Sequence, residues 1–451
     1  MIPAVNAYRQ GKASVTELLD ETLSAIENAE PVLNSFITIA DRDILQQQAA
    51  ALQRELEEHG SRGPLHGIPI GVKDVIETAE LRTTGGSKAL EDFEPARDAE
   101  SVRRLREAGA IIIGKNNTHE FAFGVTTDNE HFGACRNPID PDRIPGGSSG
   151  GSGAAVGAGL IIGSLATDTG SSIRRPAAFC GAVGIKPSFG RVSRRGAMLL
   201  SWSLDHVGPI AATISDAVVM IDAIAGHDAE DEASLAEHWH SLFPSLEQPH
   251  NITSAGIPRR WIENYCDPAI GQLFAERCRQ LEADGCRLVD IDPPFTEELL
   301  PCLRLISVVE ANLTHEERYL AHGSGYSEEL KTLVEAGGYI PARDYLKAQQ
   351  VRTILRHWID KTLAEVDIIL SPTMTMIAPY LRKQDSEGQT PSVIADASGI
   401  FCSLGALCGL PSYSLPMGLH DGMPTGILLT GPVRAERAML RFANQLERSL
   451  V

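Results

Sequence analysis

The chain has 451 residues, a formal net charge of −19 at pH 7 and 43% hydrophobic residues. This acidic charge disfavours binding to the phosphate backbone of nucleic acids. No apolar run is long enough to cross a membrane, and the N-terminus lacks the pattern of a signal peptide. We therefore expect a cytoplasmic protein with no nucleic-acid partner and no membrane contact.

The cysteine and histidine patterns give no sign of a metal site. The eight cysteines form no C-x-x-C pair, and the thirteen histidines include no H-E-x-x-H motif. Scattered cysteines in a long chain are typical of small buried side chains in a reducing compartment. We expect neither disulfides nor a metal nor a cofactor.

The N-terminal sixty residues predict two helices around a short strand. Ser14 to Glu17 has the pattern of a capping box, in which serine and glutamate satisfy the first free amides of a helix. Apolar residues at helical spacing follow as far as Ile26. A strand is expected at residues 36–39 and a second helix at about 41–57.

The next segments alternate between strands and helices. We expect a strand at 68–72 that ends at Lys73, a helix at about 100–108, and strands at 110–113 and 160–166. Later strands are predicted at 367–370, 412–415 and 426–429, and a closing helix at 432–450. The polar stretches 226–252 and 381–392 are interpreted as surface excursions. This pattern favours one α/β domain, residues 1–451, with a mixed central sheet.

Three segments carry residues suited to chemistry: 70–74, 146–153 and 167–177. The second segment, GGSSGGSG, could be a flexible linker, but it leads directly into small apolar residues, as a close-packed helix would. It also matches G-x-S-x-G, the nucleophile elbow of Ser-His-Asp hydrolases. Any Gly/Ser tract satisfies that pattern, however, and it leaves the third segment, TDTGSSIRRPA, unexplained.

Together and in this order, the three segments resemble the amidase signature family. Its pattern is a G-V-K-D lysine, a G-G-S-S-G-G-S loop and a D-T-G-G-S-[IV]-R loop. The likeness covers residues 60–215 with specific motifs, and extends more loosely through the N-terminal helices and through Gly409 to Gly426. It implies a sheet flanked by helices on both faces, with N-terminal helices at about 1–60, a catalytic core at about 61–215 and a C-terminal portion at about 216–451.

The resemblance also implies the site residues. Lys73 matches the family's lysine, Ser148 its bridging serine after a cis peptide bond from Gly147, and Ser172 its nucleophile. The backbone amides of Thr169, Gly170 and Ser171 match the oxyanion hole. Asp168 and Arg174 are expected to support the loop as an ion pair. The family has glycine at position 171, so serine would be strained there if that position needs a positive φ. The extra serine also leaves two candidates for the nucleophile; we expect Ser172, because Ile173 and Arg174 fix the register.

The chemistry is consistent with these residue types. A serine hydroxyl needs a base, and a lysine can act as one only when it is uncharged. Burial disfavours the ammonium and can bring a lysine pKa to about 7–8. The neighbouring Asp74 would oppose that shift, but alternation along a strand turns it the other way. Ser148 would then relay a proton between Ser172 and Lys73.

Substrate choice is less constrained by the sequence. The apolar segments 199–202 and 374–380, with Phe121 and Phe123, could line an acyl pocket or could simply be core. We expect a small-molecule amide, ester or carbamate (urethane) substrate, and consider a homodimer. The alternative is a glutaminase-like component of a tRNA-dependent amidotransferase complex, the role of its A subunit; a scaffold with a dead site is disfavoured because all three residues are present.

Overall fold

The computed structural model describes residues 12–381, 390, 393 and 396–450. Eleven strands form one sheet in the order β1-β3-β2-β6-β8-β7-β12-β13-β11-β9-β10. Their bounds are β1 Phe36–Ile39, β2 Pro69–Lys73, β3 Ile111–Asn116, β6 Gly163–Asp168, β7 Val183–Lys186, β8 His206–Ala211, β9 Ser254–Ile257, β10 Arg287–Asp290, β11 Ile368–Pro372, β12 Ser412–His420 and β13 Met423–Thr430. A separate two-stranded ribbon pairs β4 Asp128–Asn129 with β5 Gly133–Ala134.

The sheet is mixed, as expected. β2 runs parallel to both β3 and β6, whereas β6, β8, β7, β12 and β13 pair antiparallel in turn. The α-helices in the described residues are α2 Val15–Leu33, α3 Arg42–His59, α4 Glu100–Glu107, α5 Gly150–Gly157, α6 Arg174–Cys180, α7 Ile214–Ile224, α8 Arg259–Tyr265, α9 Pro268–Ala283, α10 Leu299–His322, α11 Glu328–Tyr339, α12 Ala342–Glu365, α14 Cys402–Cys408 and α15 Glu436–Leu450.

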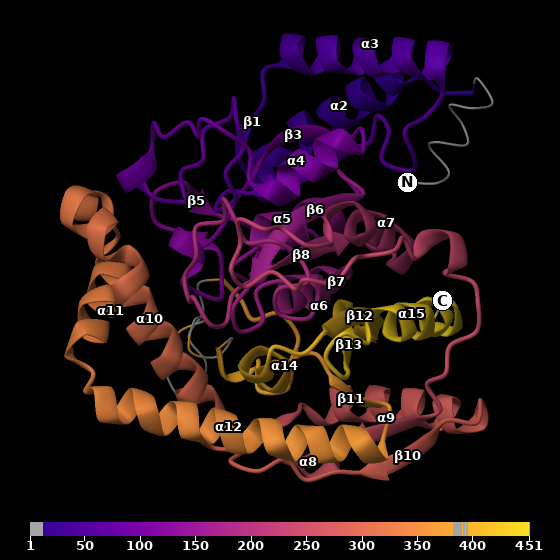
Figure 1. Cartoon of the computed structure of the whole chain (residues 1–451), viewed down its shortest axis with the longest axis vertical. Coiled ribbons are helices and arrows are strands. Elements are labelled where there is room, and N and C mark those ends of the chain that lie inside the picture. Colours follow the sequence, from indigo (N-terminus) through magenta and orange to yellow (C-terminus); the bar gives the residue numbers. More distant parts are fainter. Residues whose placement is uncertain (1–11, 382–389, 391–392, 394–395, 451) are drawn as a thin grey trace.

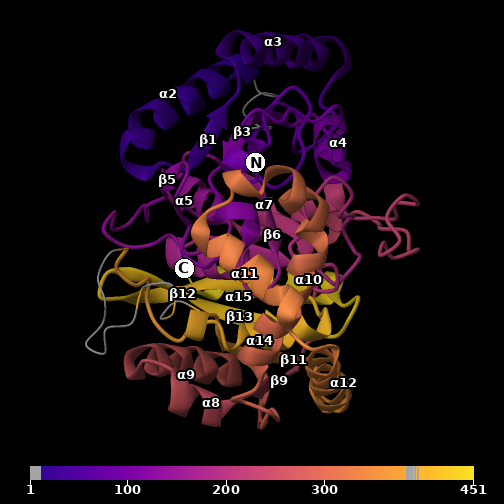
Figure 2. The ribbon, with the colours of Figure 1, turned by 90° about the vertical axis from the view of Figure 1, so that its left-hand side faces the viewer.

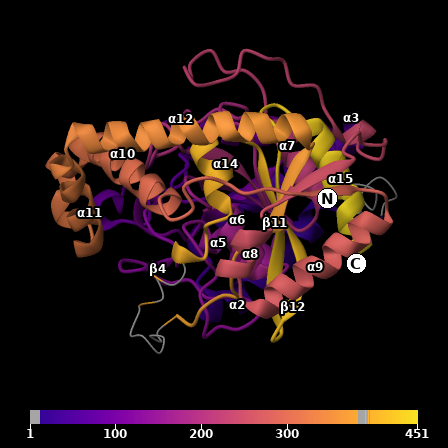
Figure 3. The same cartoon turned by 90° about the horizontal axis from the view of Figure 1, so that it is seen from below.

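Helices cover both faces of the sheet, which confirms the expected α/β fold. α5 and α6 pack together on the central strands from one side, and α7 and α15 pack on them from the other (Figure 1 and Figure 3). The long helices α10 and α12, with α11, form an arm. Figure 2 shows α10 and α11 in front of the strands. Residues of α10 and α11 line a cavity together with the loop that follows β6.

The predicted elements are largely present, with shifted bounds. The capping box of Ser14 is formed, with both reciprocal hydrogen bonds. The strand expected at 160–166 instead begins at Gly163 and ends at Asp168, because its ladder with β8 runs from Gly163 to Asp168. The strand expected at 110–113 continues to Asn116, where it pairs with Lys73. Of the stretch 381–392, all but Leu381 and Thr390 lies outside the described residues.

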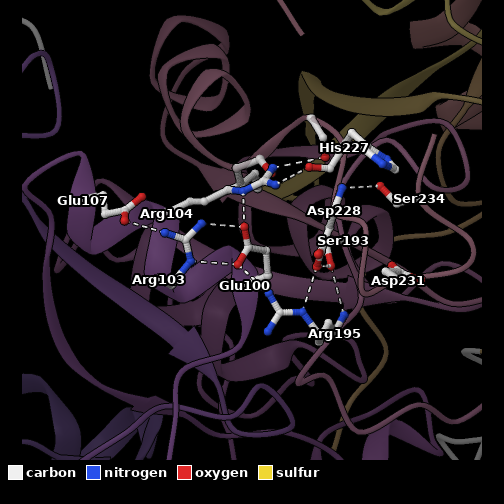
Figure 4. A network of polar contacts seen from close by, with 12 residues as sticks. Glu100, Arg103, Arg104, Glu107, Ser193, Arg195, His227, Asp228, Asp231 and Ser234 are labelled. Carbon is white, nitrogen blue, oxygen red and sulfur yellow. Dashed lines mark hydrogen bonds and ion pairs between the residues drawn. The ribbon is translucent and has the colours of Figure 1, made fainter. Parts of the chain in front are cut away.

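The polar stretch 226–252 is anchored to the domain by a network of ion pairs (Figure 4). Buried Glu100 accepts hydrogen bonds from Arg104 at 2.6 Å and from Arg195 at 2.7 Å. Arg195 in turn pairs with Asp228 at 2.9 Å, and Arg104 donates to the carbonyl of Gly226. The first part of this segment is therefore fixed against α4 by charged contacts, whereas Leu242, Leu246 and Ile252 in its second part are buried in the hydrophobic core.

The small residues of α5 let the helix approach the backbone of neighbouring segments. A Cβ at Gly151 would lie 2.4 Å from the amide nitrogen of Asn117 and 2.4 Å from the carbonyl oxygen of Ser35. At Gly271 in α9, by contrast, the nearest atom would be a side-chain methyl of Ile262 at 3.6 Å, an ordinary contact.

We predict that Gly151→Ala destabilises the protein by about 1–3 kcal/mol, because backbone atoms cannot give way to the added methyl group. Gly271→Ala is the matched control: it should be neutral or add up to about 1 kcal/mol, since alanine favours helix. Thermal unfolding of both variants checks this. Equal effects of the two substitutions would contradict the packing argument.

Candidate active site

Lys73 is the last residue of β2 and is fully buried. Its Nζ lies 2.8 Å from Ser148 Oγ and 2.7 Å from Thr167 Oγ1, both hydroxyl oxygens. Strand pairing explains this meeting, because β2 and β6 are parallel neighbours and Lys73 and Thr167 both lie near their carboxyl ends. The amine thus has two hydroxyl partners and makes no ion pair with a described carboxylate.

Burial sets the protonation of this amine. Loss of water lowers the pKa of Lys73 to about 7, against the opposing attraction of Asp205 and Asp168. A lysine with this pKa is largely uncharged slightly above neutral pH. It can therefore accept a proton, as a general base must.

Asp74 points away from Lys73, as predicted. Its carboxylate accepts hydrogen bonds from the amide and hydroxyl of Thr84, and Lys115 Nζ lies 3.7 Å from its other oxygen. Lys115 also donates to Thr83 Oγ1. The Asp74 carboxylate therefore contacts Thr84 and Lys115 on the opposite side of the strand. It is not among the charges that raise the pKa of Lys73.

The first Gly/Ser loop holds Ser148 rigidly before α5. The Gly147–Ser148 peptide bond is cis, as the family resemblance implied. The Ser148 carbonyl oxygen accepts hydrogen bonds from Thr118 Oγ1 and from the amide of His119. Thr127 Oγ1 donates to the Gly146 carbonyl and accepts from the Gly150 amide. These contacts fix the backbone, so the Ser148 hydroxyl is held beside the amine; the linker interpretation of the loop is wrong.

The second Gly/Ser loop joins β6 to α6 and is held by two carboxylates. Asp168 pairs with Arg174 at 2.9 Å and accepts a hydrogen bond from the Ile173 amide. Burial would raise the pKa of Asp168, but the charge and hydrogen bonds of Arg174 lower it to about 2, so it stays ionised. Thr169 Oγ1 donates to Asp205 at 2.6 Å. The predicted supporting pair of Asp168 and Arg174 is present.

The backbone amides of Thr169, Gly170, Ser171 and Ser172 follow one another in this loop, which includes the three residues predicted for the oxyanion hole. None of these N–H groups is hydrogen-bonded to any residue that the structure describes. Adjacent free amides beside a cavity are suited to hold a negatively charged oxygen. Ser171 is not among the described non-glycine residues with positive φ, so serine meets no backbone strain where the family has glycine.

A cavity opens against this loop. Its wall includes Thr169, Gly170, Ser171 and Ser172, apolar side chains from four other parts of the chain, and four charged residues. The apolar side chains are Phe123, Val125, Leu200, Leu300, Leu303 and Leu333, and the charged residues are Arg175, Arg304, Glu329 and Asp396. Helices α10 and α11 supply much of this wall, which is why the arm is needed to complete the site.

The expected specificity residues are only partly in the cavity. Leu200 and Phe123 line it, as expected. Phe121 instead packs in a buried aromatic group with His315 and Tyr326. Trp202 lines a different hollow, and residues 374–380 are not among the described residues of this cavity wall. These apolar side chains fill core or surface positions, the alternative that the sequence left open.

Sequence reasoning did not single out Thr167, Asp205 or Arg175. Thr167 and Arg175 lie within the third motif, so that motif was the available signal for both. Asp205 sits 36 residues beyond its partner Thr169, and only strand pairing between β6 and β8 brings the two together. The walls from α10 and α11 carry no motif at all.

Within the described residues, no group of three or more metal-ligating side chains is found. All eight cysteines are free thiols. None of the helices in the described part of the chain is both long and apolar enough to span a bilayer.

The comparisons with known proteins agree on one family. The family model described as Amidase matches residues 17–440. The A subunit of the glutamyl-tRNA(Gln) amidotransferase from Carboxydothermus hydrogenoformans is 34% identical, over 97% of this chain and 94% of that protein. A solved structure described as an amidase is 33% identical with a TM-score of 0.89, covering 100% of this chain and 99% of that one.

A second solved structure is that of native peptide amidase from Stenotrophomonas maltophilia. It is 29% identical with a TM-score of 0.84, over 99% of this chain and 95% of that one. The relatives are thus named as amidases or as part of an amidotransferase, and they match almost the full length. The expected resemblance to the amidase signature enzymes is confirmed: this chain belongs to the amidase family.

Proposed function

We propose that the protein cleaves amide-type C–N bonds through an acyl-enzyme on Ser172, with Ser148 as proton relay and Lys73 as base. The observation that carries this proposal is the buried Lys73 amine. Burial lowers its pKa to about 7, and its Nζ lies 2.8 Å from Ser148 Oγ in the first Gly/Ser loop. Metal chemistry is not needed for this route, since serine supplies the nucleophile and lysine the base.

The steps conserve protons. As Ser172 Oγ bonds to the substrate carbonyl carbon, its proton passes to Ser148 Oγ, and the Ser148 proton passes to Lys73 Nζ. The oxygen that becomes negatively charged is held by the free amides at Thr169 to Ser172. When the C–N bond breaks, the proton returns through Ser148 to the leaving amine. Water then attacks the Ser172 ester by the same relay and releases the acid.

The remaining loop residues act through their neighbours. Thr167 Oγ1, at 2.7 Å from Lys73 Nζ, orients the amine toward Ser148. Asp168 and Arg174 hold the start of α6, and Thr169 is fixed by Asp205. Gly147 and the contacts of the Ser148 carbonyl fix the relay serine. Preorganised groups of this kind contribute by avoiding rearrangement during the reaction.

Two forms of the function remain, and they differ in partner. In the first, the chain works alone on a small amide, carbamate or ester, which the apolar leucines of the cavity favour. In the second, it is one component of a tRNA-dependent complex, in which it releases ammonia from glutamine. The curated relatives favour the second, since several named as the A subunit of glutamyl-tRNA(Gln) amidotransferase are 34–37% identical. Solved structures described as an amidase and a peptide amidase favour the first.

Replacing the proposed nucleophile separates the two candidate serines. Ser172→Ala should lower kcat/KM on the order of 10⁴-fold or more, because residues of a catalytic unit act together. Ser171→Ala should change it by less than about 10-fold, because one neutral hydrogen bond contributes only ~1 kcal/mol. Peptide mapping after reaction with a serine-directed phosphonate should find the adduct on Ser172; an adduct on Ser171 would refute the assignment.

The pH dependence follows from the base. Lys73 must be uncharged to accept a proton, so kcat/KM should fall as pH decreases through about 7 and level off above it. Burial also lowers the pKa of Lys186 to about 7, so a variant beside Lys73 is needed to assign the titration to Lys73. Thr167→Val removes an acceptor of the Lys73 ammonium and should shift the midpoint to lower pH. An unchanged midpoint would place the titration elsewhere.

The two forms are distinguished by the purified chain alone. A free-standing hydrolase should release p-nitroaniline from simple acyl anilides or a phenol from an aryl carbamate, with turnover that is independent of added protein. The complex-dependent form should be nearly inert on these substrates and on glutamine until amidotransferase partners and charged tRNA are added. Turnover of glutamine only in the complex would reject the free-standing form.

A further inference from the structure

Arg175 is a cation in the cavity wall with no ion-pair partner among the residues that the structure describes. It follows Arg174 in α6, is only 2% exposed, and lines the cavity with Ser171 and Ser172. Its Nε is fully buried and donates to no atom of the described residues. A buried arginine is normally paired, because an isolated charge is costly to remove from water.

The neighbouring charges are already engaged. Asp168 is occupied by Arg174 at 2.9 Å. Asp396 at the cavity wall pairs with Arg304 at 3.1 Å. Glu329, the other acidic wall residue, faces His119 at 3.9 Å. Within the described part of the chain, the guanidinium of Arg175 is therefore left with attraction from Asp396 at longer range and no direct ion pair.

The surroundings of Arg175 leave room for its head group beside Ser171. A Cβ at Gly399 would lie 2.6 Å from Arg175 Nη2 and 3.6 Å from Ser171 Oγ, so the glycine makes space for both. The Arg175 amide donates to the Ser171 carbonyl at 2.7 Å, which fixes the start of the helix. Ser172 lies two residues before α6 begins at Arg174, and it lines the same cavity as Arg175.

We propose that Arg175 binds a carboxylate of the substrate, so that the enzyme acts on small amides that carry a carboxylate group. This inference rests on the proposed amide hydrolysis at Ser172 and narrows its substrate class. A planar guanidinium donates two parallel hydrogen bonds to a carboxylate, and burial strengthens the pair. The leucines of the cavity contact the short carbon chain between the carboxylate and the amide.

Binding to an inactive enzyme tests the proposal without turnover. With Ser172→Ala, isothermal titration should show that succinamate and glutaramate bind more tightly than butyramide and valeramide, their neutral counterparts. The difference should be roughly 10- to 100-fold, as for hydrogen bonds to a charged group. It should vanish in Ser172→Ala/Arg175→Gln and persist in Ser172→Ala/Arg304→Gln. Arg304 is the matched control, because it lines the same cavity but already has a carboxylate partner.

Folding is checked separately. Because no described carboxylate pairs with Arg175, Ser172→Ala/Arg175→Gln should unfold at the same temperature as Ser172→Ala or higher. Succinamate should raise the unfolding midpoint of Ser172→Ala and leave that of Ser172→Ala/Arg175→Gln unchanged. L-glutamine is included as a carboxylated amide that also carries an ammonium. Tight binding of glutamine alone, dependent on Arg175, would support the carboxylate site and assign it to an amino acid.

Each failure points to a different claim. If succinamate, glutaramate and L-glutamine all bind no more tightly than the neutral amides, or if a preference for them survives Arg175→Gln, the carboxylate site is overturned while amide hydrolysis is left intact. Arg175-dependent binding of succinamate to a wild-type protein that hydrolyses no amide, alone or with partners, would leave the binding site standing and reject the proposed reaction.

Discussion

The burial of the Lys73 amine away from water is the constraint on which the rest of this site depends. Lys73 is fully buried at the end of a central strand, and its direct partners among the described residues are two hydroxyl groups and no carboxylate. Each feature disfavours the ammonium, since neutral hydroxyls compensate a charge less well than water or an acid does. The remainder of the site can be understood as the means of bringing Ser148 and the loop of Ser172 to this amine while keeping solvent away.

The loops are shaped by backbone contacts that lie outside the reacting groups. Ser148 is held through its own carbonyl, by Thr118 and the amide of His119. The loop of Ser172 is tied by Asp168 to Arg174, deep beneath the cavity. In the reaction that we propose, both loops are thus fixed by the fold, and the free amides at Thr169 to Ser172 would hold a charged oxygen without rearrangement. Within the arm, α10 and α11 contribute the leucines that line the cavity.

Sequence alone predicted the parts of this site that are local. Lys73, Ser148 and Ser172 stand in three short motifs whose order resembles one family, and the mixed sheet was predicted from the alternation of helices with buried apolar runs such as 110–113. The sequence could not predict contacts that depend on strand pairing, such as that of Thr169 with Asp205. Nor could it predict that Leu303 of α10 and Leu333 of α11 line the cavity.

Two residues show why the rest stayed out of reach. Phe121 was a candidate either for the acyl pocket or for the core because it is apolar, and it packs in the core against His315 and Tyr326. The sequence did not indicate a separate role for Arg175, because nothing in it shows which of two adjacent arginines pairs with a carboxylate. Only the folded chain shows that Arg174 pairs with Asp168 while Arg175 has no ion pair within the described residues.

The ionisation of Lys73 itself is the most direct measurement of the central claim. In protein labelled with ¹³C at the lysine side chains, the resonance that disappears in Lys73→Met can be assigned to Lys73 and titrated by NMR. An apparent pKa near 7 is the result that the buried site requires. A pKa close to that of a solvated lysine, about 10.4, would mean that position 73 is a cation in the active range of pH, and the base would have to be another group.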